Sequence, residues 1–340
     1  MQSGLLQNLI DPAILFFVFG VFAGAVRSNL EIPAPIAKFF SLFLLISLGL
    51  KGGASLAITG LSGAGAMALL GAVIMATIVP IYSFLILRNR INPFDAAAVA
   101  ATYGSVSAVT FVTAQNFLVR NQVEFDGHMT VALVIMESPA IIMAVLLSSM
   151  VRRQAALAAQ TPGNGNVLPV LSIKKVLHEA FTDGSHMVLI GSLVIGWMTG
   201  AEGKKIMDPF YGVLFKGILA FFLMEMGLLV ARQLRDARES RDPRGALGPI
   251  TLGFALAVPV VNATVALAIA AAFGLSGGNA FLLMVLSASG SYIAVPAIVR
   301  YAIPEARPGV YFTMSLAFTF PFNIVLGIPL YFAAVNHFWK

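Results

Sequence analysis

Long apolar segments, separated by charged or Gly/Pro-containing stretches, run through the whole chain. Of its 340 residues, 59% are hydrophobic and only 11% are charged, and the mean hydropathy is +0.90. Soluble domains carry roughly a quarter charged residues. A bilayer core about 30 Å thick takes about 20 apolar residues per helix. We therefore expect an all-α polytopic membrane protein, and the apolar runs predict spans at 12–30, 34–52, 63–88, 95–120, 129–151, 185–201, 208–231, 247–273, 279–303 and 308–337.

The composition excludes several functional classes. The chain has no cysteine, so disulfides, thiolate nucleophiles and Cys-ligated metals are ruled out, and its four histidines have no metal-ligand spacing. No phosphate-binding loop, HExxH or G-x-S-x-G motif is present, which disfavours an enzyme. The net charge of +6 comes from loop residues, so it indicates topology rather than nucleic-acid binding. Asp11 precedes the first apolar run without a basic residue, which favours a retained span over a cleaved signal peptide.

The basic residues indicate an orientation. Five spans precede the polar connection 152–184 and five follow it. By the positive-inside rule, both termini are expected outside the cytoplasm, in a bacterial inner (plasma) membrane. The expected cytoplasmic loops then collect 15 of the 21 Lys and Arg residues, namely Arg27, Lys38, Arg88, Arg90, Arg152, Arg153, Lys174, Lys175, Arg232, Arg235, Arg238, Arg241, Arg244, Arg300 and Arg307.

Two spans share a motif that predicts an internal repeat. Residues 103–110 read YGSVSAVT and residues 289–296 read SGSYIAVP, so Gly-Ser and Ala-Val align at an offset of 186. The same offset places Glu137 opposite Asn323. Because each half has an odd number of spans, the halves would enter the membrane in opposite directions, as in many transporters. We predict ten helices in a 5+5 inverted repeat with broken crossing helices at spans 4 and 9, the first repeat at 1–151, a cytoplasmic linker at 152–184 and the second repeat at 185–340.

The paired motifs suggest a binding site. Gly and Ser within a membrane helix allow it to unwind, and unwound backbone is tolerated only where protein or a watery cavity satisfies it. Each break leaves a half-helix N-terminus whose free N–H groups suit a small anion, while carbonyls and hydroxyls suit a cation such as sodium. The alternative is that these small residues only allow close helix packing.

Acidic residues inside spans are the other candidates. Glu137 has no basic neighbour along its helix, which predicts a sodium ligand or proton carrier; the alternative is a protonated carboxyl bonded to backbone freed by Pro139. Glu225 is expected to contact another helix or subunit, and Asp95 to cap a helix. The mixed-charge stretch 232–244 predicts a solvated helix extension, or a docking surface for a regulatory protein or anionic lipid.

The residues at these positions resemble a known family. The run Ser287–Ala297, with Arg300 and the Ile303–Ala306 segment IPEA, is similar to the second crossing helix of the cyanobacterial sodium-dependent bicarbonate transporters, and Met136–Ala140 (MESPA) resembles the family's Met-acid-x-Pro-Ala segment. The chain departs from the family pattern twice. Glu137 stands where Asp is usual, and Ser107–Thr110 (SAVT) stands where a Gly-Ser-Thr type run is expected.

The resemblance implies a homotrimeric sodium/bicarbonate symporter with an elevator motion and no cofactor besides the coupling ion. Spans 1, 2, 6 and 7 would form a gate domain and the other six a core domain. A cytoplasmic PII-like regulatory protein is a further implied partner. By motif matching, bicarbonate would bind Gly104, Ser105, Val106, Ser107, Gly290, Ser291 and Tyr292. Sodium would bind Glu137, Thr110, Ser289 and Asn323. Transport of another small carboxylate, coupling to protons, and an anion channel stay open as alternatives.

Overall fold

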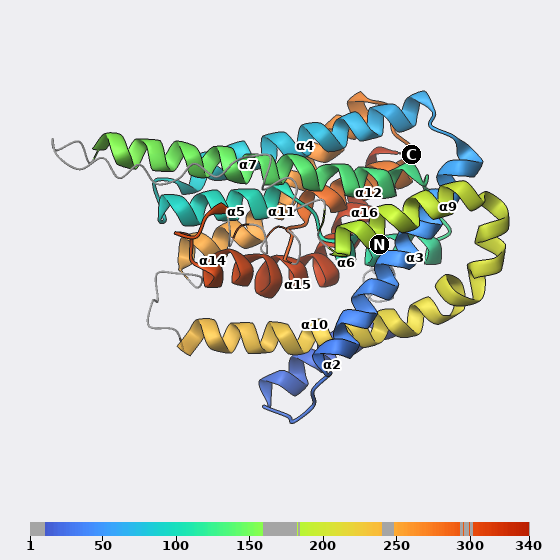
Figure 1. Cartoon of the computed structure of the whole chain (residues 1–340), viewed down its shortest axis with the longest axis horizontal. Coiled ribbons are helices and arrows are strands. Elements are labelled where there is room, and N and C mark those ends of the chain that lie inside the picture. Colours follow the sequence, from blue (N-terminus) through green and yellow to red (C-terminus); the bar gives the residue numbers. More distant parts are fainter. Residues whose placement is uncertain are drawn as a thin grey trace.

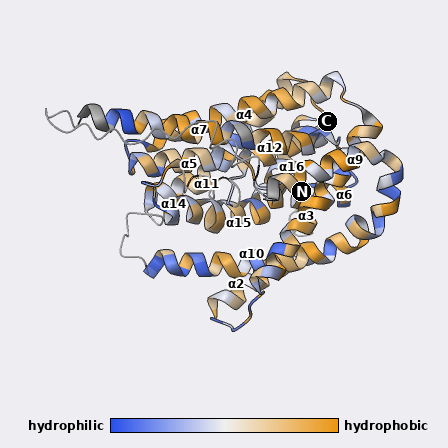
Figure 2. Ribbon diagram, viewed as in Figure 1, coloured by the Kyte–Doolittle hydropathy of each residue, from blue (hydrophilic) through white to orange (hydrophobic). Residues whose placement is uncertain are grey.

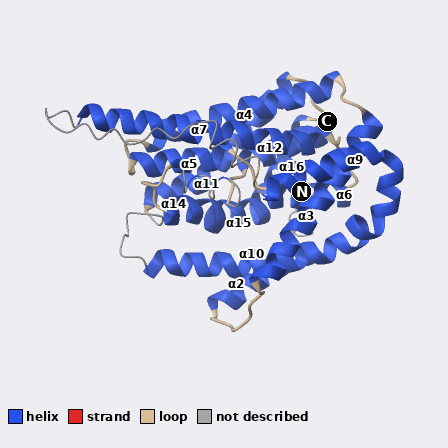
Figure 3. Cartoon of the chain, viewed as in Figure 1, coloured by secondary structure: helices blue, strands red, loops and turns tan. Residues whose placement is uncertain are grey.

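A computed structural model describes residues 11–158, 182, 184–239, 248–292, 295, 299 and 302–339. Within these residues all regular structure is helical, and Figure 3 shows helices joined by short loops. Most helices run along the long axis of the molecule (Figure 1). The described elements are α2 (Pro12–Ala25), α3 (Ala34–Thr59), α4 (Gly63–Leu87), α5 (Pro93–Gly104), α6 (Ala108–Arg120), α7 (His128–Ala158), α9 (Gly184–Asp208), α10 (Leu214–Glu239), α11 (Pro249–Ala272), α12 (Gly277–Ala288), α14 (Pro308–Phe312), α15 (Phe320–Phe322) and α16 (Ile328–Phe338), with π-helical turns at Pro209–Val213, Thr313–Thr319 and Asn323–Gly327.

The helix lengths confirm a multi-pass membrane protein. Seven helical segments among the described residues are long and apolar enough to cross a bilayer, and α2 and α12 are shorter apolar helices. Between the sixth and seventh expected spans the chain is helical over most of Met187–Glu239, but it is broken at Gly200, whose φ of 55° and ψ of −137° are not helical, and a π-helical turn at 209–213 precedes α10. Gly200 has a φ of 55°, which a residue with a Cβ rarely adopts. The count of ten spans stays a prediction.

Two helix pairs pack closely because a glycine of one helix lies against the backbone of the other. A methyl group on Gly20 of α2 would lie 2.1 Å from the carbonyl oxygen of Met224 in α10. One on Gly53 of α3 would lie 2.0 Å from the carbonyl oxygen of Leu193 in α9. Small residues allow such backbone approach in membrane proteins, where dispersion contacts hold helices together. These pairs, α2 with α10 and α3 with α9, lie beside the layer that contains α4, α5, α7 and α12 (Figure 1).

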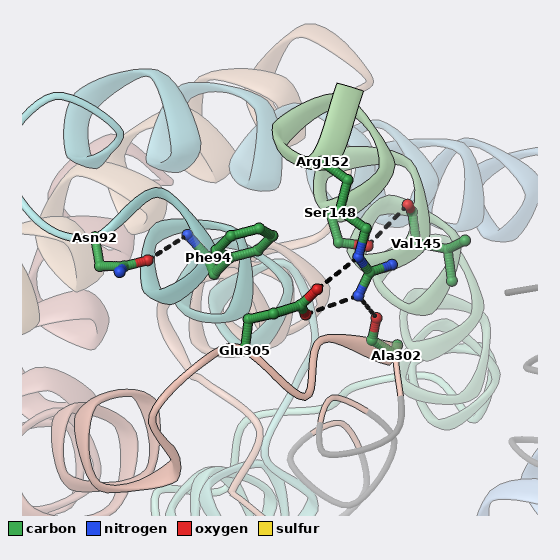
Figure 4. Close-up of polar contacts among 7 residues, drawn as sticks. All are labelled: Asn92, Phe94, Val145, Ser148, Arg152, Ala302 and Glu305. Atoms are coloured by element: carbon green, nitrogen blue, oxygen red, sulfur yellow. Dashed lines mark hydrogen bonds and ion pairs between the residues drawn. The ribbon is translucent and has the colours of Figure 1, made fainter. Parts of the chain in front are cut away.

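Ion pairs join the two halves of the chain at one end of the bundle. Arg152 of α7 donates two hydrogen bonds of 2.8 Å to the carboxylate of Glu305 and one of 3.0 Å to the carbonyl of Ala302 (Figure 4). The Arg152 hydrogen bond lowers the pKa of the Glu305 carboxyl below its usual value. Figure 2 shows hydrophilic residues gathered at this end, where α7 and α10 terminate.

The expected capping role of Asp95 is wrong. Asn92 caps α5, because its side-chain oxygen accepts from the Phe94 amide at 2.9 Å (Figure 4). Asp95 is fully buried one turn in, and accepts from the backbone amide and the guanidinium of Arg307 at 2.6–2.8 Å. A buried carboxylate needs such a partner, and here the partner lies 212 residues further along the chain.

The 152–184 linker begins inside α7, which continues to Ala158. The rest of that linker is almost entirely outside the described residues, including Lys174 and Lys175. Residues 240–247 of the mixed-charge stretch are also outside them.

Candidate functional site

The fourth apolar segment is broken as its sequence predicts. Helix α5 ends at Gly104, and the chain is extended at Ser105 (φ −97°, ψ −172°) and Ser107 (φ −107°, ψ 111°) before α6 begins at Ala108. The Ser107 hydroxyl caps α6: it accepts from the Thr110 amide at 3.2 Å and shares a 2.9 Å hydrogen bond with the Thr110 hydroxyl. Serine is a preferred N-cap because its oxygen satisfies an amide that has no helical partner.

The ninth segment has a matching break. Helix α12 ends at Ala288, Ser289 is extended (φ −86°, ψ 160°), and 289–292 are not helical. The Ser291 hydroxyl accepts from the Val295 amide at 3.2 Å. Helices α5 and α12 each have 12 residues and start 184 residues apart. This offset of 184 residues between the helices is close to the 186-residue offset between the two sequence motifs.

The two breaks touch each other directly. The Ser107 amide donates to the Ser289 hydroxyl at 2.9 Å, and the Ser291 amide donates to the carbonyl of Thr102 at 2.9 Å. The Ser289 hydroxyl in turn donates to the carbonyl of Leu286 at 2.8 Å. Each broken helix thus provides a hydrogen-bond acceptor for a backbone amide of the other. Unwound backbone inside a membrane needs such partners. We call residues 105–107 together with 289–292 the crossing.

A cavity of about 50 Å³ lies against the crossing. Because about 10–15 Å³ of such space holds one water molecule, it has room for a few water-sized groups. Its walls come from the crossing, α6 and α7 on one side and from α3, α9 and α10 on the other. The lining residues are Ser41, Leu44, Leu45, Val106, Ser107, Ala108, Val109, Val112, Glu137, Leu189, Phe222, Ser291 and Tyr292.

Five of the residues predicted for the site line this cavity: Val106, Ser107, Glu137, Ser291 and Tyr292. Glu137 lies on α7 and is 7% exposed. Four side chains with polar groups therefore converge there from three segments that are far apart in sequence. Such convergence in a mostly apolar pocket is typical of a small-ligand site.

The other predicted residues lie behind the cavity wall. Thr110 and Ser289 hold the backbone of the crossing, as described above. Asn323 donates to the carbonyl of Ala288 at 2.9 Å and accepts from the Tyr331 hydroxyl at 2.9 Å, so its amide stabilises the end of α12.

Gly104, Ser105 and Gly290 also do not line the cavity. A Cβ on Gly104 would lie 2.1 Å from Cγ of Pro80, the proline inside α4, which explains the glycine by packing. The hydroxyl of Ser105 is fully buried and has no hydrogen-bond partner among the described residues. A buried hydroxyl without a partner is costly and suggests a missing ligand.

Several cavity residues were not predicted. Ser41, Leu44, Leu189 and Phe222 come from α3, α9 and α10. Ser41 is a polar residue at the start of an apolar run, which is a weak sequence signal. The leucines and the phenylalanine have no signal, because a residue facing an apolar cavity wall looks like one facing lipid.

The charges around the cavity favour joint binding of an anion and a cation. Glu137 lines it, and no described Lys or Arg does. The amides of Ala108 and Val109, at the start of α6, have no acceptor within the helix. They lie at the positive end of the helix dipole. No cluster of three or more His, Cys, Asp or Glu residues that could hold a metal ion occurs in the described part of the chain.

Comparison with known proteins agrees with this geometry. The sequence model of the Na+-dependent bicarbonate transporter superfamily matches residues 12–336, which include both broken helices, Glu137 and every cavity residue. No individually curated protein matches the chain. A match over nearly the whole length shows that the chain belongs to the Na+-dependent bicarbonate transporter superfamily.

Proposed function

We propose that the protein is a sodium-coupled bicarbonate symporter and that the cavity at the crossing is its substrate site. The observation that carries this proposal is the small cavity where two broken helices meet, lined by Ser107, Ser291, Tyr292 and Glu137. Bicarbonate has four non-hydrogen atoms, which fits a space of about 50 Å³. The hydroxyls and the α6 amides are hydrogen-bond donors suited to its oxygens.

The acid in the cavity explains why the anion would need sodium. In its ionised form Glu137 repels an anion that binds in the same cavity, and no described Lys or Arg lines that cavity. A sodium ion bound between them removes this repulsion, since opposite charges within a poorly solvated site attract strongly. Two oxygen groups are candidates for holding sodium: the Glu137 carboxylate, which lines the cavity, and the buried Ser105 hydroxyl of the crossing.

The arrangement of helices supports alternating access by a moving core. One cavity wall belongs to α3, α9 and α10, and the other to the crossing and α7. These are elements of the proposed gate and core domains. We propose an inverted repeat of two five-helix halves, an elevator motion of the core, both termini outside the cytoplasm, and a homotrimer. The exposed apolar residues of α9, such as Trp197 and Met198, suit lipid or subunit contacts.

The test is uptake of radiolabelled bicarbonate into proteoliposomes at fixed alkaline pH, with and without an inward sodium gradient. Accumulation that requires sodium is expected. Glu137→Gln should remove most of it, and Ser291→Ala should raise KM, because each loses a group that lines the cavity. Glu225→Gln is the matched control, since Glu225 lies in α10 but does not line the cavity.

Other outcomes would point elsewhere. Inhibition by pyruvate-like acids would indicate another carboxylate as substrate, and uptake driven by a pH gradient alone would indicate protons as the coupling ion. Conductance without accumulation would indicate a channel. Unchanged sodium-dependent uptake in both Glu137→Gln and Ser291→Ala would refute the assignment of the site.

A further inference from the structure

A second pocket lies next to the substrate cavity, further along the same helices. It has a volume of about 160 Å³. Its lining residues are Ser47, Leu48, Lys51, Val112, Gln115, Asn116, Val119, Tyr211, Gly212, Phe215 and Lys216. The central cavity uses Leu44 and Leu45 of α3, whereas this pocket uses the next turns of the same helix. We call it the lysine pocket.

The two spaces lie end to end along α6. Val112 lines both of them and is 2% exposed, so the substrate cavity and the lysine pocket adjoin at this side chain. Helix α10 shows the same order: Phe222 faces the cavity, and Phe215 and Lys216 face the pocket. The pocket is therefore on the path from the substrate site toward the bend between α9 and α10.

The charges in and around the lysine pocket favour anions. Lys51 and Lys216 line it, and both are exposed to solvent. The other charges that act on Lys51 are Lys204 and Asp208, which leaves an excess of positive charge. A concave surface of one sign, between apolar walls, focuses the field and raises the local concentration of the opposite ion.

A buried polar side chain marks the inner end of the pocket. Gln115 of α6 lines it, is only 8% exposed, and has no hydrogen-bond partner among the described residues. It lies one helical turn beyond Val112, on the side away from the crossing. Its amide can both donate and accept a hydrogen bond, so it is able to bind an anion that enters the pocket.

We propose that the lysine pocket is the anion entrance of the transporter: Lys51 and Lys216 attract the anion, and the Gln115 amide receives it before it passes Val112. This inference rests on the proposed function, since it assigns the route by which that function's substrate arrives. It places Lys51 and Lys216 in control of the rate of substrate capture rather than of the translocation step.

The pocket can be probed without transport, because the chain has no cysteine of its own. Gln115→Cys, and Asn116→Cys as a second position, would be treated in intact cells with two membrane-impermeant methanethiosulfonates of similar size, one carrying a sulfonate and one a trimethylammonium group. We expect labelling from outside, with the anionic reagent several-fold faster at low ionic strength. Adding Lys51→Gln should remove this preference, and Lys205→Gln, a neighbouring exposed lysine that does not line the pocket, should not.

Transport gives the second readout. Lys51→Gln and Lys216→Gln should each raise the KM for bicarbonate about two- to five-fold at low salt with kcat unchanged, and the difference should shrink at high salt because mobile ions screen exposed charges. The proposed entrance would be refuted if neither cysteine is labelled from outside, or if Lys51→Gln leaves the preference for the anionic reagent unchanged. An unchanged KM in both lysine variants would overturn its role in substrate capture. If wild-type protein accumulates no bicarbonate, the proposed function fails, and the labelling results still decide whether the pocket is an anion entrance.

Discussion

Gly104 and Gly290 occupy matching positions in the two sequence motifs, but the structure assigns them different tolerance to a side chain. A Cβ on Gly104 would lie 2.1 Å from Cγ and 2.7 Å from Cδ of Pro80, whereas one on Gly290 would meet Cβ of Ser315 at 3.4 Å. The first contact is a severe overlap with a rigid proline ring, and the second is close to ordinary contact. We predict that Gly104→Ala destabilises the protein and that Gly290→Ala has a much smaller effect.

The expected magnitude follows from two opposing effects. Inserting a methyl group into a packed interior typically costs about 1–3 kcal/mol. Replacing glycine by alanine at the end of α5 offsets at most about 1 kcal/mol through helix propensity. Because the overlap at Pro80 is large, a net loss of about 1–2 kcal/mol is expected for Gly104→Ala, equivalent to a fall of a few degrees in Tm. The displaced end of α5 carries Thr102, whose carbonyl binds the Ser291 amide, so uptake should fall as well.

The assay is thermal unfolding of the purified protein in detergent, with sodium-dependent uptake measured in parallel. Pro80→Ala in the Gly104→Ala background removes the obstructing ring atoms, so the double variant should be more stable than the sum of the single effects predicts. Equal Tm values for Gly104→Ala and wild type would refute the reasoning, and so would an equal loss in Gly290→Ala.

Three further predictions concern the polar side chains of Asp95, Glu305 and Ser105. Asp95→Asn should lower stability by about 2–4 kcal/mol, because it leaves the Arg307 guanidinium without its carboxylate; Arg307 is half-exposed, so water offsets part of the full cost of a broken buried pair. Unfolding of Asp95→Asn and wild type in denaturant measures the difference. The lowered pKa of Glu305 means that its ion pair with Arg152 stabilises the fold above pH about 5 and is lost as the pH falls through the folded pKa. Glu305→Gln should therefore show a weaker decline of Tm as the pH is lowered below the ordinary pKa of a glutamate carboxyl. Ser105→Ala should match or exceed wild-type stability without sodium, since it removes an unpartnered buried hydroxyl, but should reduce the rise in Tm that sodium produces. An equal sodium-dependent rise in both proteins would exclude Ser105 from the ion site.

Local chemistry made part of the site predictable. Both helix breaks follow from Gly and Ser in otherwise apolar runs, whereas the capping of α6 by Ser107, through the Thr110 amide, was not predicted. Glu137 was conspicuous because an isolated acid in a membrane span needs a reason. These signals lie within a few residues along the chain, so no knowledge of packing was needed to find them.

Contacts between distant segments were not predictable in the same way. Asp95 pairs with Arg307, although its position after Pro93 suggested only a cap. The contact between the two broken segments, in which the Thr102 carbonyl accepts from the Ser291 amide, joins residues 189 positions apart and has no local sequence signal. Likewise, the Ser107 amide donates to the Ser289 hydroxyl, 182 residues further along the chain.

The sequence by itself determined that this protein lies in a membrane, that it is helical, that two of its apolar helices are broken, and to which family it belongs. Insertion into lipid and helix breaking depend on composition and short-range pattern, which the sequence contains. Only the tertiary structure decided which of the eleven predicted site residues face the cavity, and that Leu44, Leu189 and Phe222 complete its wall. The physical reason is that lipid and protein interior are equally apolar, so hydropathy does not distinguish a lipid-facing leucine from one that lines a substrate cavity.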